Sequence, residues 1–88
     1  MTRIMQAELD RLLAEMIDLQ ERKVLGIARQ VLPHLTRDDL WNSYNHPELD
    51  GDTYFQYEDG HLAGLMAARI AIAARFKEKR DGASIEPR

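Results

Sequence analysis

Carboxylates and histidines are concentrated in the middle of this chain, and residues of these types could form a divalent-metal site. Asp and Glu oxygens are the ligands that hard cations prefer. The residues that would hold such an ion are His46, Asp50, Asp52, Glu58, Asp59 and His61. An EF-hand loop does not fit, because counting from Asp50 puts Phe55 at the glycine position and His61 in place of the bidentate Glu. A small ligand- or metal-binding protein, or a minor enzyme, therefore stays as the alternative to a solvated acidic loop.

Catalysis has no recognisable motif in this sequence. A phosphate-binding loop needs a Lys-Ser/Thr pair after its glycines, and neither Gly60 nor Gly64 is followed by one. The H-E-x-x-H pattern of zinc proteases does not occur either. We expect no catalytic residue and no cofactor.

Aromatic residues suggest a different kind of chemistry, since five of the six fall between positions 41 and 57. Trp and Tyr combine an apolar body with a polar tip, which suits them to interfaces. The leading interpretation is a non-catalytic protein-interaction or regulatory module, whose recognition surface would comprise Trp41, Tyr44, Tyr54, Phe55, Tyr57 and Arg69. We also expect the rings to fold this segment down onto the helices as an ordered loop.

Arg69 admits two interpretations. On a helical wheel it projects among large apolar residues of the last helix, so its charge must reach water or a carboxylate. It pairs with an acid of the loop or of the first helix, or it receives an anionic ligand or a partner's carboxylate.

The last helix must position these residues, and residues 60–76 sort by size around its axis. Large apolar side chains fall on one side, and Gly60, Gly64, Ala67, Ala68, Ala71 and Ala74 fall on the opposite side. Small residues let a second helix approach closely. We expect this face to be a subunit contact in a homodimer, and two chains would form a four-helix bundle. The alternative is that the first helix and the aromatic loop cover both faces within one chain.

The remaining pattern predicts an all-α fold in a single domain, residues 1–88. A long first helix, 3–32, has one broad apolar side comprising Met5, Leu9, Leu12, Leu13, Met16, Leu19, Val24, Ile27 and Val31. A short helix, 37–44, follows, because Thr36 and Asp39 resemble a capping box. An ordered aromatic and acidic loop, 45–57, then leads to a second long helix, 58–80, which returns antiparallel. Residues 81–88 would form a frayed tail.

Composition and charge limit the cellular location and the classes of partner that we expect. The chain has no cysteine, its net charge is −3, and its first residues include acidic side chains that do not suit a signal peptide. Arg69 and Arg75 interrupt the longest apolar run, so a membrane span is not expected. Basic residues near one helix end are a weak nucleic-acid footprint in a chain with a pI of 5.5. We expect a cytoplasmic homodimer with a possible protein partner, and neither nucleic acid nor membrane.

Overall fold

The all-α class is confirmed by a computed structural model, which describes residues 3–85 and, of the side chains in that range, all but those of Tyr44 and residues 80–85. The structure is 87% helical and has no strand among the described residues. Its elements in chain order are α1 (Arg3–Val31), α2 (Arg37–Leu40), the 3-10 helix η1 (Ser43–Asn45), α3 (Pro47–Asp50) and α4 (Thr53–Ile85).

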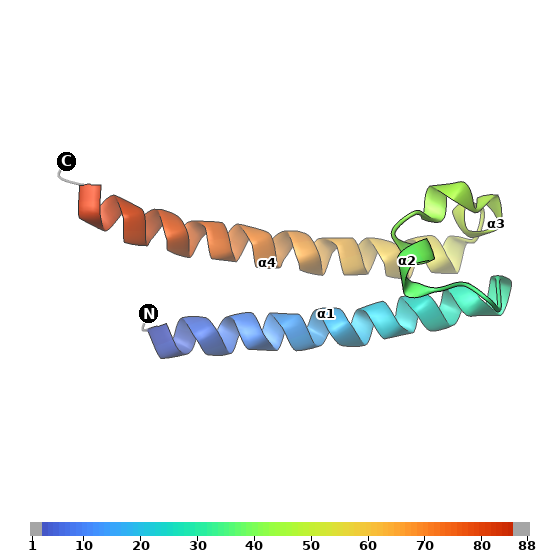
Figure 1. Cartoon of the computed structure of the whole chain (residues 1–88), viewed down its shortest axis with the longest axis horizontal. Coiled ribbons are helices and arrows are strands. Elements are labelled where there is room, and N and C mark those ends of the chain that lie inside the picture. The colour runs from blue at the N-terminus through green and yellow to red at the C-terminus, as the bar shows by residue number, and fades with distance from the viewer. Residues whose placement is uncertain (1–2, 86–88) are drawn as a thin grey trace.

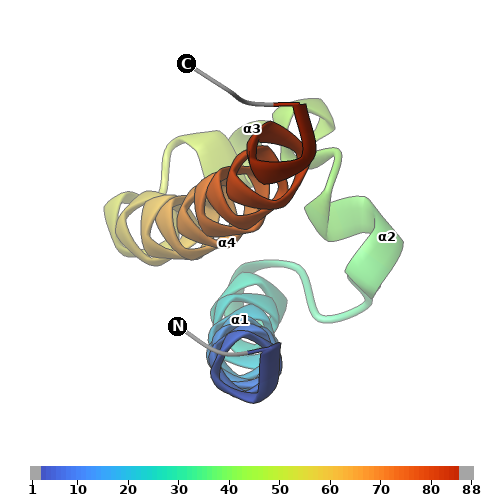
Figure 2. The same ribbon diagram turned by 90° about the vertical axis from the view of Figure 1, so that its left-hand side faces the viewer.

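Two long helices form the body of the molecule. Figure 1 shows α1 and α4 side by side and running in opposite directions, with α2 and α3 gathered at the end where the chain turns back. The end-on view in Figure 2 shows that α2 lies beside the two-helix layer on one side only. The result is an elongated molecule of 54 × 23 × 19 Å.

The end of α1 follows from its sequence. Pro33 disfavours helical geometry in the residue before it, and the helix accordingly stops at Val31. The backbone amide of Leu32 still donates to the Ala28 carbonyl (2.8 Å), and Arg29 Nε donates to the Leu35 carbonyl (2.9 Å). These bonds hold the exit of the chain against the last turn of α1.

The short helix is shorter than the sequence pattern predicts. Its start is as expected, since Thr36 and Asp39 form a reciprocal capping box. It ends at Leu40 rather than at residue 44, because Asn42 adopts φ −120° and ψ 39°, outside the helical region. Asn and Ser side chains compete for backbone hydrogen bonds, which explains a break at this point.

The prediction of an irregular loop at 45–57 and a helix start at 58 is also corrected. Pro47 occupies the first turn of α3, a position that suits its fixed φ and missing donor. Helix α4 begins at Thr53, since Asp52 Oδ1 accepts from the Phe55 amide (2.8 Å) and the Asp52 carbonyl accepts from the Gln56 amide (3.0 Å). An N-cap therefore lies inside the segment that turn formers had marked as a loop.

The far end of α4 differs from prediction too. The helix continues to Ile85, five residues beyond the predicted boundary at 80. No proline interrupts it before Pro87, which disfavours helical geometry only in the residue preceding it. Of the predicted frayed tail, residues 86–88 lie outside the described part of the chain.

The hydrophobic core occupies one end of the layer, where the chain turns back. The three largest fully buried side chains come from three different helices: Val24, Leu49 and Phe55. The cluster is completed by Ile27, Ala28, Leu35, Leu40 and Leu62. Towards the chain termini, no third element among residues 3–85 lies over α1 and α4, and several large apolar side chains of α1 are exposed.

The N-cap of α4 gives a test of this fold. Asp52→Ala should lower the free energy of unfolding by about 1 kcal/mol, the usual value of an N-cap carboxylate. Asp50→Ala is the matched control, because Asp50 is an exposed acid two residues away, and its change should stay within about 0.5 kcal/mol. Urea unfolding followed by circular dichroism measures both. Equal losses would show that Asp52 does not define the start of α4.

Candidate functional site

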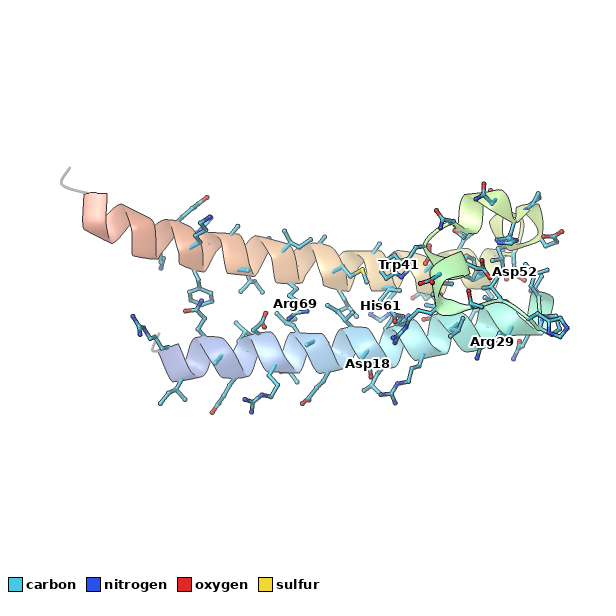
Figure 3. All side chains as sticks on the ribbon, viewed as in Figure 1. Asp18, Arg29, Trp41, Asp52, His61 and Arg69 are labelled. Atoms are coloured by element: carbon cyan, nitrogen blue, oxygen red, sulfur yellow. The ribbon has the colours of Figure 1, made fainter. Side chains whose placement is uncertain are left out.

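Arg69 is paired within the chain. Its Nε donates to Asp10 Oδ1 (2.9 Å) and its Nη2 donates to Asp10 Oδ2 (3.0 Å), so the guanidinium and the carboxylate form a two-pronged bond between α4 and α1 (Figure 3). The hydrogen bond from Arg69 lowers the pKa of Asp10, and the guanidinium charge adds to this effect. Of the two interpretations, the geometry therefore matches the one in which Arg69 pairs with an acid of the first helix. It does not match the one in which Arg69 receives an anion from outside the chain.

Glu58 forms a second polar link between the long helices, and it is buried. Gln20 Nε2 donates to both the Glu58 carbonyl (2.9 Å) and Glu58 Oε1 (2.8 Å), while Lys23 Nζ lies 3.2 Å from Oε2. His61 Nδ1 is 3.9 Å from Oε1. The hydrogen bond from Gln20, with a further contribution from Lys23, lowers the pKa of Glu58. These donors stabilise the ionised form of the buried Glu58 carboxylate. Glu58 therefore acts as a structural link between the two long helices.

The residues of the proposed metal site have separate roles. Asp52 caps α4, Glu58 bonds to α1, and burial raises the pKa of Asp59. His46 lines a shallow hollow beside Asp39 with Leu32, Pro33, His34 and Leu35. In the part of the chain that the structure describes, no three His, Asp or Glu side chains are placed to hold a metal ion. The six residues named for this alternative are therefore not gathered into one cluster in the described part of the chain.

The described aromatic side chains between positions 41 and 57 comprise one buried ring and three exposed rings. Phe55 is fully buried in the core, whereas Trp41, Tyr54 and Tyr57 are 54%, 55% and 72% exposed. The expectation that the rings fold down together onto the helices is thus wrong for these three. The side chain of Tyr44 lies outside the described part of the structure.

The small-residue face of α4 is uncovered within one chain. All six of its members are exposed: Gly60, Gly64, Ala67, Ala68, Ala71 and Ala74. A Cβ added at Gly60 or Gly64 would meet nothing within 4 Å. The first helix instead packs on the opposite side of α4, where Leu62 is buried.

The apolar side of α1 consists of two stripes that differ in burial, whereas the sequence pattern predicted one broad side. One stripe enters the core through Leu13, Val24 and Ile27. The other is largely exposed and comprises Met5, Leu9, Leu12, Met16 and Leu19. A signal for the second stripe was present, because its members recur at intervals of four and three, the spacing of a coiled-coil seam.

None of the described helices combines the length and the apolar character that crossing a bilayer requires. In comparisons with protein-family models, curated proteins and solved structures, this chain has no match. What the chain does must therefore follow from its own residues.

Glu58 makes the stability of the fold depend on pH. Its folded-state pKa lies below the ordinary value of 4.5, so its contribution is complete above pH 4.5 and disappears as the pH falls through the lowered value. Glu58→Gln should therefore melt at a lower temperature than the wild type at pH 7 and show a shallower loss of melting temperature between pH 5 and pH 3. Thermal melts followed by circular dichroism measure this.

Glu48→Gln is the control for that experiment, since Glu48 is an exposed acid of α3. It should keep the wild-type pH dependence. A Glu58→Gln profile parallel to that of the wild type would rule out Glu58 as a source of acid sensitivity.

Proposed function

We propose that this chain is a non-catalytic protein-interaction module whose recognition surface is built on Trp41, Tyr54 and Tyr57. The observation that carries the proposal is the exposure of these three rings beside buried anchors. Leu40 is buried next to Trp41, and Phe55 is buried between Tyr54 and Tyr57 in sequence. Exposed rings on an ordered base lose little conformational entropy when they bind, and Trp and Tyr are the residues that most often dominate binding energy.

The charge near the rings indicates the kind of partner. Asp38, Glu48 and Asp50 are exposed, and the segment from 38 to 59 contains no Lys or Arg. A partner surface that presents apolar and basic side chains would complement it. The buried Glu58 favours this reading over an enzyme, since it already bonds to Gln20 rather than facing a cleft.

The rings can be tested by partner capture. A Trp41→Ala, Tyr57→Ala double variant should lose at least tenfold in affinity for a partner that the wild type retains, because truncated hot-spot residues cost about 2 kcal/mol or more. Ile70→Ala is the matched control, being 70% exposed on α4 and away from the rings. Trp41 is the only tryptophan, so its fluorescence should shift to shorter wavelength when the purified partner is added. Retention of full affinity by the double variant would refute the assignment.

We further propose that the module works as a cytoplasmic homodimer arranged as a four-helix bundle. The cysteine-free composition supports the cytoplasmic part of this proposal, because disulfides are rare in that compartment. The accessible surface of the chain is 6580 Å², against about 5,300 Å² for a compact monomer of its mass. The excess of about 1,300 Å² exceeds the area of about 800 Å² that each partner buries in an interface of standard size.

Light scattering over a dilution series tests the dimer. The expected molar mass is twice the 10.2 kDa of one chain, persisting at low micromolar concentration. A molar mass of one chain throughout would contradict the dimer but leave the recognition surface of Trp41, Tyr54 and Tyr57 untouched.

A further inference from the structure

One side of the two-helix layer presents a continuous apolar surface. Arg37 of α2 pairs with Glu21 and Asp18 of α1, which places α2 over that flank of the helix. The opposite flank carries what we call the open face: Met5, Leu9, Leu12, Met16 and Leu19 of α1 with Leu65, Ile72 and Phe76 of α4.

The two helices contribute jointly to the open face. Leu9 lines a shallow groove with Ile72 and Phe76, and the adjoining hollow is lined by Met5, Leu9 and Leu12. Along α1 the seam then continues to Leu19, which is 64% exposed. Its spacing of four and three residues keeps the seam on one side of the helix for four turns, which suits packing against another straight helix.

Charges flank the open face with opposite signs. Glu8 and Glu15 are exposed along the outer edge of α1, whereas Arg75 and Lys79 are exposed along the edge of α4. Arg75 and Lys79 line the same groove as Leu9, so the basic edge lies level with the first turns of α1. Arg75 Nε lies 3.7 Å from Glu78 Oε2 of its own helix, and both side chains are exposed.

We propose that the open face binds the open face of a second copy, so that α1 of each chain packs against α4 of its partner. This inference rests on the homodimer proposed above and names its interface. A two-fold axis parallel to the helices makes all neighbouring helices antiparallel, as in an up-down four-helix bundle. It also brings the acidic edge of α1 opposite the basic edge of the partner's α4, with Glu8 near the partner's Arg75.

The other symmetric arrangement is electrostatically worse. A two-fold axis perpendicular to the helices would pair α1 with the partner's α1 around Leu12. Glu8 would then lie near the partner's Glu15, and like charges across a helix contact are destabilising. The charges therefore select the parallel axis. In that dimer the small-residue face of α4 points away from the partner.

Lysine substitutions on the open face test the interface. Leu12→Lys and Leu19→Lys should each raise the dissociation constant of the dimer by about 100-fold, because each change occurs twice in the symmetric contact. Ile70→Lys is the matched control, since Ile70 is as exposed as Leu19 but lies off the open face. Sedimentation across a dilution series gives the constants, and circular dichroism checks that each variant stays helical.

Charge reversal tests the arrangement without touching the apolar contact. Glu8→Arg and Arg75→Glu should each weaken the dimer by about fivefold, and the combined variant should regain nearly wild-type affinity. Additivity of the two losses would overturn the proposed pairing of α1 with the partner's α4.

Cross-linking offers an independent measurement, because the chain has no cysteine of its own. The double variant Glu8→Cys, Arg75→Cys should form a covalent dimer under mild oxidation, and each single variant should not. A covalent dimer from Leu12→Cys alone would overturn the parallel axis in favour of the perpendicular one.

The outcomes separate this inference from the proposed homodimer. A wild-type chain that is monomeric at every concentration refutes both. A dimer that survives Leu12→Lys and Leu19→Lys, but dissociates with Ala71→Lys, refutes the open face alone and assigns the contact to the small-residue face. Dissociation by the open-face variants only, with Ala71→Lys neutral, supports the inference.

Discussion

The structure depends on burying Phe55. This ring is fully enclosed in a cluster to which α1 contributes Val24 and α3 contributes Leu49. Because the cluster lies where the chain turns back, it joins the two long helices at one end and fixes α3 against them. Further towards the chain termini, the described part of the molecule consists of α1 packed against α4. The exposure of the open face follows directly from that one-sided core.

Two polar links set how α1 and α4 lie against each other. Gln20 meets Glu58 near the core, and Asp10 meets Arg69 further along. Such bonds add little stability at an exposed site, but a displacement of one helix along the other would break both together. Breaking the Gln20–Glu58 link would destabilise the fold more than breaking the Asp10–Arg69 link, since it would leave a buried carboxylate without that partner. Residues that resembled ligands for a metal or an anion thus specify the register of the helix pair.

The two proposed binding surfaces lie in different parts of this molecule. The exposed rings of Trp41, Tyr54 and Tyr57 sit on the elements gathered around the core, where their backbone is held in place. The apolar seam on α1 extends towards the chain termini, and its Leu12, Met16 and Leu19 side chains are exposed. A dimer through the seam would leave Trp41, the C-cap residue of α2, accessible, because α2 lies on the other flank of α1. The two proposals are therefore compatible within one assembly.

The sequence by itself determined the two long helices approximately and the start of α2, because helix formation responds to local signals. The apolar period of α1, Pro33 at its exit and the Thr36 cap were all readable. In residues 45–57 the local signals conflicted. Pro47 and Gly51 predicted turns, and the N-cap at Asp52 was therefore not predicted. Only the tertiary structure decided which apolar residues are buried. Leu12 and Leu13 are neighbours in one pattern, yet one is exposed and the other buried, since the position of α4 selects the stripe that it covers. The partners of Arg69 and Glu58 were undetermined for the same reason: they lie 59 and 38 residues away in sequence.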